Sequence, residues 1–304
     1  MIPYTRKTLP NGLTVVVNRD RASKLAAVNI LYRVGARNEN PARTGFAHLF
    51  EHLMFRGTRA VENFDLPVQM ASGDNNAFTN NDYTDFYITL PKDNLETALW
   101  LESDRMEGLD ITPAKLEAEK KVVIEEFRQR YLNQPYGDQT MLLRALAYKV
   151  HPYRWAAIGL ATDHIAGATL ADVESFYRAH YRPSNAILSI SADMEEERML
   201  ELAEKWFAPL ADHPSATAAI PQEPMQTQAR RQEVERDVPA STVTVAYHMC
   251  ARTKLDFYTA DLVSDLLSGG DSGRLYTHLV KERNLLSSVN AYITGDVDPG
   301  LFVF

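Results

Sequence analysis

Apolar and polar residues follow two different periods along the first two thirds of the chain. Strand-like stretches alternate every second residue and are rich in Val, Ile, Thr and aromatic residues. They cover residues 4–9, 13–18, 25–33, 77–90 and 185–192. Other stretches have the apolar spacing of amphipathic helices. They cover residues 93–107, 112–131, 136–149, 170–180 and 195–207. Strands mixed with paired helices predict an α+β fold.

A stretch without apolar periodicity, residues 212–231, follows this pattern and is rich in Pro, Ala and Gln, as linkers are. After it the first pattern partly repeats. Strands are predicted at 242–249, 288–294 and 301–304, and helices at 257–267 and 275–283. We therefore expect duplicated sandwich lobes at 1–211 and 232–304, each a largely antiparallel sheet with helices packed on one face. Because the pattern stops within an apolar strand, we expect that the second lobe is incomplete and that the sequence is a piece of a longer protein.

Composition narrows the functional classes. The chain has 304 residues, of which 45% are hydrophobic, and this suffices for two domains with substantial cores. A net charge of −8 without a basic cluster argues against nucleic-acid binding. No apolar run approaches the roughly 20 residues needed to cross a bilayer, so we expect no membrane segment. The single cysteine, Cys250, and the absence of a signal-peptide pattern favour a cytoplasmic location.

The most informative stretch is residues 44–56, Thr-Gly-Phe-Ala-His-Leu-Phe-Glu-His-Leu-Met-Phe-Arg. On a helix, His48, Glu51 and His52 fall within an arc of roughly 100°, while apolar side chains cover the other sides. Burying these polar groups costs on the order of several kcal/mol unless a charge compensates them. Two histidines four residues apart can bind one zinc ion, with Glu51 beside it as a general base. The alternative is a pair of core histidines bonded to carbonyl groups.

A zinc site needs a third protein ligand, and residues 116–130 predict a helix that could supply it. Glu119 and Glu126 are two turns apart on one face of this helix. Glu126 follows an apolar run and is a candidate for an inward-facing ligand, with Glu119 supporting the site from behind. The residues alone do not decide between Glu126 and Glu125.

The motifs together resemble the family of zinc peptidases that includes pitrilysin, insulin-degrading enzyme and mitochondrial processing peptidase, particularly its short bacterial members. In this family the third ligand ends a Glu-x6-Glu pair some seventy residues after the second histidine. Here Glu126 follows His52 by 74 positions (126 − 52) and Glu119 completes the pair. Further matching segments are Asn75-Asn76-Ala77-Phe78-Thr79, Tyr181-Arg182-Pro183-Ser184-Asn185-Ala186 and Asp298-Pro299-Gly300-Leu301-Phe302.

The resemblance implies a zinc-dependent endopeptidase that hydrolyses short unstructured peptides. His48, His52 and Glu126 would bind one zinc ion, and Glu51 would take a proton from the metal-bound water. Two other functions share this fold. One is a non-catalytic core subunit, as in respiratory complex III, against which the intact motif argues. The other is S-ribosylhomocysteine lyase, a far shorter enzyme without a second lobe.

The resemblance also implies how peptides bind and what the chain lacks. The strand after the metal helix offers its edge to an extended peptide in this family, and Asn76, Ala77 and Phe78 occupy that place. Members that act alone carry an Arg and a Tyr seven residues apart in the second lobe, where this chain has Val280 and Ser287. We therefore expect a heterodimer with a homologous subunit that supplies the pair, unless Arg283 substitutes for the missing Arg.

Overall fold

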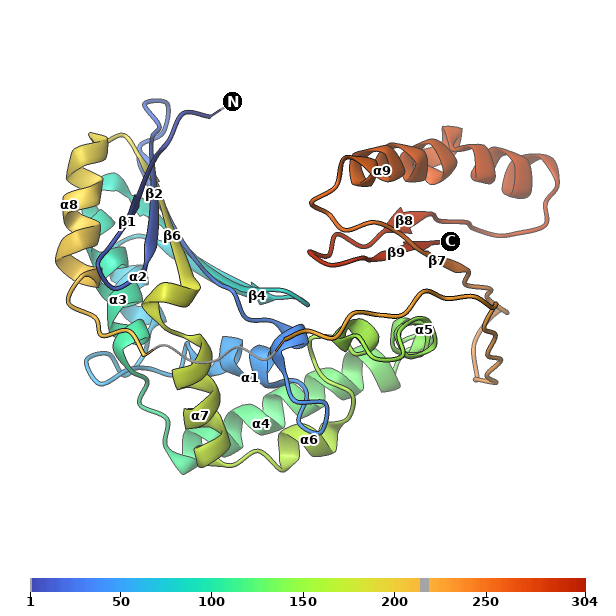
Figure 1. The fold of residues 1–304 in the computed structure, drawn as a ribbon, viewed down its shortest axis with the longest axis horizontal. Helices are drawn as coiled ribbons and strands as arrows, with labels where there is room; N and C mark the ends of the chain where they lie inside the picture. Colours follow the sequence, from blue (N-terminus) through green and yellow to red (C-terminus); the bar gives the residue numbers. More distant parts are fainter. Residues whose placement is uncertain (1, 214–218) are drawn as a thin grey trace. The chain divides into compact units, whose positions relative to one another are not determined.

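The computed structural model describes residues 2–213 and 219–304, and their contacts divide the chain into two compact units (Figure 1). Unit 1 comprises Met1–Leu132 and His151–Gln222, and unit 2 comprises Asn133–Val150 and Glu223–Phe304. Residues 133–150, which we expected within the first lobe, therefore belong to unit 2. Part of the expected linker, residues 214–218, lies outside the described residues.

Unit 1 is built on a six-stranded sheet. Its strands are β1 (Thr5–Thr8), β2 (Thr14–Arg19), β3 (Leu25–Tyr32), β4 (Asp74–Thr79), β5 (Thr84–Pro91) and β6 (Ala186–Ala192), in the order β1-β2-β6-β3-β5-β4. Every neighbouring pair is antiparallel except β2 and β6, which are parallel. The predicted α+β class with a largely antiparallel sheet is confirmed.

The alternation of β3 determines which of its faces is buried. Ala26, Val28, Ile30 and Tyr32 are fully buried, and the residues between them are intermediate or exposed. Successive side chains of a strand point to opposite faces, so one face of β3 enters the core. The single strand expected at 77–90 is wrong, because the structure has a hairpin there. The side chain of Asn80 accepts hydrogen bonds from the backbone of Asp82 and Tyr83, which turns the chain between β4 and β5.

Helices α3 (Leu95–Glu107) and α8 (Glu196–Phe207) cover one face of this sheet, and α1 (Phe46–Leu53), α4 (Pro113–Phe127) and α7 (Leu170–His180) pack together beside it (Figure 1). The helix at residues 170–180 agrees with its prediction, and Thr169 caps it. Helices α2 and α6 have six and five residues and were not predicted, because such short runs show no clear period. The helices of unit 1 are η1 (Ala36–Asn38), α1 (Phe46–Leu53), α2 (Asp65–Met70), η2 (Lys92–Asn94), α3 (Leu95–Glu107), α4 (Pro113–Phe127), η3 (Arg128–Leu132), η4 (Pro152–Arg154), α6 (Thr162–Ala166), α7 (Leu170–His180), η5 (Pro183–Asn185) and α8 (Glu196–Phe207).

Unit 2 contains a smaller antiparallel sheet in the order β7-β9-β8. Its strands are β7 (Ala246–His248), β8 (Tyr292–Ile293) and β9 (Leu301–Val303), each shorter than predicted. Its helices are α5 (Gln139–Ala147), α9 (Leu255–Ser268), η6 (Gly270–Ser272) and η7 (Tyr276–Glu282). Across the described residues of both units, no helix combines the length and apolar character that a membrane span requires.

Candidate metal centre

Helix α1 begins at a position that only glycine fits. Gly45 precedes the helix with φ +90°, in the left-handed region. A Cβ atom there would lie 2.6 Å from the carbonyl oxygen of Ile158. Thr44 fixes the approach of the chain, because its hydroxyl lies 2.9 Å from His164 Nδ1 and accepts a hydrogen bond from the Leu160 amide at 2.7 Å. The helix is thereby anchored to the loop before α6.

Helix α4 is positioned by a capped start and a buried face. The hydroxyl of Thr112 accepts a hydrogen bond from the Lys115 amide, which satisfies one of the free donors at the start of the helix. Glu119 and Val123 are buried, and Glu126 lies one turn further along the same face. Because α4 packs against α1, this face meets the histidines.

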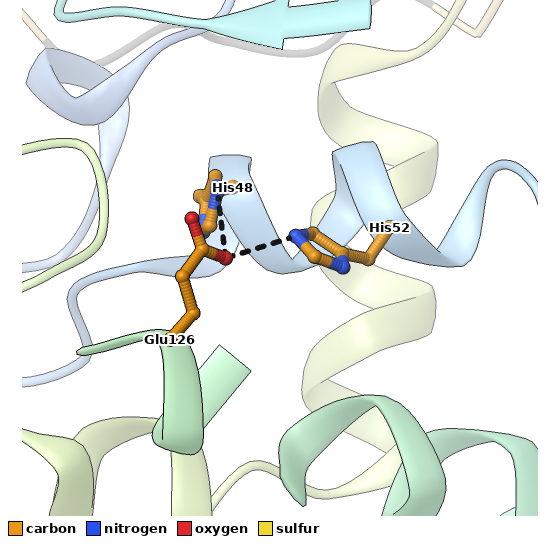
Figure 2. A group of neighbouring side chains, drawn as sticks. All are labelled: His48, His52 and Glu126. Carbon is orange, nitrogen blue, oxygen red and sulfur yellow. Dashed lines mark ion pairs between the residues drawn. The ribbon is translucent and has the colours of Figure 1, made fainter. Parts of the chain in front are cut away.

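The structure brings His48, His52 and Glu126 together at one point (Figure 2). Glu126 Oε2 lies 3.6 Å from His48 Nε2 and 3.4 Å from His52 Nε2, and one donor atom from each residue lies within 4.8 Å of the others. Glu125, the alternative that the sequence left open, points elsewhere. Its side chain is 53% exposed and pairs with Arg128.

The glutamates at the site are held by further charged groups. Glu119 Oε2 lies 3.5 Å from His52 Nδ1, and Glu119 Oε1 lies 2.5 Å from Arg56. Glu119 therefore lies on the side of His52 that faces away from Glu126. Glu126 is held in a similar way, because its second oxygen, Oε1, lies 3.1 Å from Arg130. Each glutamate therefore offers one oxygen to histidine and the other to arginine.

The pKa directions follow from burial and from these contacts. Burial lowers the pKa of His48 to about 4, so its neutral form prevails and keeps a lone pair. Burial also acts to lower the pKa of His52, but Glu119 and Glu126 outweigh it and raise the pKa to about 9. The hydrogen bond with His52 lowers the pKa of Glu126. A cation at this point would displace the proton of His52.

These residues fit a zinc ion. Two imidazole nitrogens and one carboxylate oxygen are a common donor set for zinc. With metal–ligand bonds of about 2.0–2.1 Å, tetrahedral geometry separates neighbouring ligand atoms by roughly 3.3–3.4 Å. The nitrogen–oxygen separations of 3.6 and 3.4 Å are close to that value. In the described part of the chain, this is the one group of three such side chains placed to share a metal.

Glu51 lies on the same helix and faces strand β4. Burial raises the pKa of its carboxyl group, and a hydrogen bond with the Thr79 side chain opposes this shift. Strand β4 pairs with β5 on one side and is the edge of the sheet on the other. Of the strand residues predicted to contact peptide, Asn76 and Phe78 are exposed and Ala77 is intermediate.

Sequence reasoning missed Glu39 at this site. Its Oε2 accepts a hydrogen bond from the Gly45 amide and its Oε1 one from the Ala47 amide, both at 2.9 Å. Trp155 Nε1 also donates to Oε2, at 3.1 Å. Burial raises the pKa of Glu39 to about 8, and these donors oppose the shift. No local motif could have found it, because helix-capping patterns place the cap within a few residues of the helix.

An α+β unit with two helix histidines and a glutamate at one point is typical of a metal-binding domain, and comparisons with known proteins place it in a family. Residues 14–156 match insulinase (peptidase family M16), and residues 167–304 match the peptidase M16 inactive domain. The chain is 34% identical to the zinc protease PqqE of Helicobacter pylori, over 98% of this chain and 68% of that protein. It is 25% identical to a probable mitochondrial-processing peptidase subunit beta of Arabidopsis thaliana, over 99% of this chain and 59% of that protein.

The fold agrees with these relatives. A crystal structure of a protease from Helicobacter pylori matches with a TM-score of 0.93 and 32% identity, covering 100% of this chain and 74% of that one. The chain therefore belongs to the M16 peptidase family, and the family resemblance drawn from its motifs is confirmed.

Proposed function

We propose that this protein is a zinc-dependent endopeptidase that cleaves short unstructured peptides. The observation that carries the proposal is the meeting of His48, His52 and Glu126 at one point, with Glu51 on the same helix. Relatives named zinc proteases support the same reading. His48, His52 and Glu126 would hold the ion. When bound, zinc lowers the pKa of a water molecule and polarises a peptide carbonyl group.

Glu51 moves the proton in this reaction. Its carboxylate accepts a proton from the attacking water and then donates it to the leaving nitrogen of the cleaved bond. The raised pKa of Glu51 suits both proton transfers, because a carboxyl group whose pKa is closer to neutral pH can accept the proton and also donate it. Glu119 holds His52 in place and is itself paired with Arg56, and Arg130 pairs with the second oxygen of Glu126.

The edge of β4 would hold the substrate. An extended peptide can add to an exposed strand through backbone hydrogen bonds, which tolerate many sequences. Such a peptide would pass Asn76, Ala77 and Phe78 and reach Thr79, whose side chain contacts Glu51. A folded domain cannot offer a free strand at this edge, so we expect slow cleavage of stably folded proteins.

The first experiment combines metal analysis with a quenched-peptide assay on purified protein. E51Q should retain zinc and lose activity by roughly 10²–10⁴-fold. E126Q should lose zinc. E125Q is the matched control, because Glu125 is exposed and adjacent to Glu126 in the sequence. This variant should keep both its zinc and its activity. Wild-type protein that holds no zinc and turns over no peptide would favour the non-catalytic subunit, and turnover that E51Q leaves intact would contradict the role of Glu51.

We further propose that the enzyme works with a homologous subunit. Val280 has no polar group, and Ser287 offers neither the cationic donor of an Arg nor the phenol hydroxyl of a Tyr to stabilise a developing oxyanion. Removing one such donor typically raises the barrier by about 2.7–4 kcal/mol. The chain alone should therefore turn over slowly, and addition of its homologue should raise activity at least tenfold. High activity of the isolated chain, unchanged in R283A, would contradict the partner requirement. The cytoplasmic location stays a prediction.

A further inference from the structure

The two histidines of the candidate metal centre are held in different ways. Behind His52, the carboxylate of Glu119 lies 3.5 Å from Nδ1 and fixes the ring from the side away from Glu126. His48 has no such support, because its buried Nδ1 has no hydrogen-bond partner among the described residues. Metal-binding histidines usually depend on a second contact for their orientation. The direction of the His48 ring therefore depends on the backbone that carries it.

That backbone is the first turn of α1, which lacks an ordinary cap. The first amide groups of a helix have no partner within the helix and need acceptors when they are buried. Gly45 has no side chain to supply one, and its left-handed conformation and contact with Ile158 exclude a larger residue. The hydroxyl of Thr44 is already engaged by His164 and Leu160. The acceptor must come from elsewhere.

Glu39 supplies this acceptor and lies six residues before Gly45 in the sequence. Its two oxygens accept separate bonds from Gly45 and Ala47, and Trp155 donates a third. Each partner is an N–H donor, so the carboxylate matches all three at once. The Glu39 side chain is buried, where a lost bond costs more than at the surface. Ala47 is the residue immediately before His48.

We propose that Glu39 is a positioning residue for the metal centre, which sets the direction of His48 by fixing the first turn of α1. The inference rests on the proposed zinc site. The alternative is that Glu39 contributes only to the stability of the fold. The two readings differ in what happens to zinc binding by protein that is still folded.

The test is the zinc dissociation constant, measured by competition with a chelator in the absence of substrate. E39Q keeps the size of the side chain but turns one acceptor oxygen into an amide that faces an N–H donor. We expect its zinc dissociation constant to rise by about tenfold or more. Amide hydrogen exchange at Gly45 and Ala47 should accelerate in the same variant. W155F leaves both backbone bonds in place and should change the constant by less than about threefold.

E102Q is the matched control for stability alone. Glu102 is also a buried carboxylate, but it pairs with Arg105 in α3 and touches none of the three candidate ligands. E102Q should lower the melting temperature and leave zinc affinity within about twofold. If E39Q resembles E102Q in both measurements, the positioning role is refuted.

If E39Q fails to fold, E39D tests the positioning role instead. The shorter side chain keeps the charge and withdraws the oxygens from the helix, so zinc binding should weaken by several fold. Zinc affinity of folded E39D equal to that of wild type would overturn the proposal. Wild-type protein that binds no zinc would instead refute the proposed function, so the two failures are distinguishable.

Discussion

Helices α1 and α9 each follow a strand of their own unit, yet they are buried to very different degrees. In α1, six of eight residues are buried. In α9, Phe257 and Ser264 are the buried residues, and large apolar side chains of the helix remain exposed. Leu255, Tyr258, Leu262 and Leu266 are 85%, 62%, 71% and 49% exposed. An apolar stripe at helical spacing is thus covered in one unit and open in the other.

The difference shows what the metal centre needs besides its helix. The histidines of α1 meet Glu126 only because α4 packs across α1, and α7 closes the opposite side. Phe50 of α1 stacks on Phe176 and Tyr181 at ring distances of 5.3 and 5.1 Å. These aromatic contacts bury the apolar side of α1, while α4 covers the side that carries the histidines, where a buried charge must be compensated. A helix with one open face, like α9, could solvate the same side chains and would bind a metal less strongly.

The largest expected effect is the loss of stability when a buried leucine of α1 is replaced by alanine. The same replacement at an exposed leucine of α9 is the comparison. L49A removes a fully buried side chain from α1 and should lower the unfolding free energy by about 2–5 kcal/mol, because it leaves a cavity. L262A removes an exposed side chain from α9 and should change the unfolding free energy by about 0.5 kcal/mol or less.

Tryptophan fluorescence in urea separates the two units. All three tryptophans, Trp100, Trp155 and Trp206, lie in unit 1. L49A should shift this transition, and L262A should leave it unchanged, while far-UV circular dichroism follows the helices of both units together. A large loss of stability in L262A would mean that the exposed face of α9 is covered in solution.

A smaller effect should follow from His180, a half-buried histidine of unit 1. Burial, with Arg182 adding to it, lowers the pKa of His180 to about 4 from an ordinary value of 6.5. The unfolded state therefore binds the proton more readily. The stability contributed by neutral His180 is fully present above pH 6.5 and is lost as the pH falls toward 4, by about 1–3 kcal/mol.

The measurement compares wild type with H180N between pH 4 and 7 by urea denaturation. Both proteins are kept with a chelator, so that proton-linked release of metal does not contribute. H180N should show a flatter dependence on pH. Parallel curves for the two proteins would show that His180 does not titrate in a buried state.

Much of this arrangement could be predicted from the sequence, and the exceptions have physical causes. His48 and His52 are four residues apart on one helix, so local geometry alone places them together. Glu126 required the family resemblance, because Glu125 and Glu126 are equally plausible until α4 is docked against α1. Glu39 could not be predicted, since its role depends on the loop around Trp155, which is distant in the sequence.

The hairpin of β4 and β5 shows a different limit. Residues on both sides of the turn are strand formers, so residues 77–90 show one continuous β pattern. The turn depends on the Asn80 side chain and its backbone bonds, which leave little trace in hydrophobic periodicity. In unit 2, β7 and β8 are shorter than their sequence patterns, because neither has strand partners along its full length.

The smallest expected effect concerns how helices begin in the two units. In unit 1 the Thr169 hydroxyl accepts a hydrogen bond from the Asp172 amide, and the Asp172 carboxylate accepts one from the Thr169 amide. T169A should therefore cost about 1 kcal/mol of stability. Helix α9 starts after Lys254, which has extended backbone angles suited to a cap but makes no side-chain capping bond. Its positive charge also opposes the helix dipole. K254S should therefore stabilise α9 by about 0.5–1 kcal/mol, seen as slower amide hydrogen exchange after Leu255. Unchanged exchange in K254S would mean that the start of α9 is frayed, so that a cap has no ordered helix to stabilise.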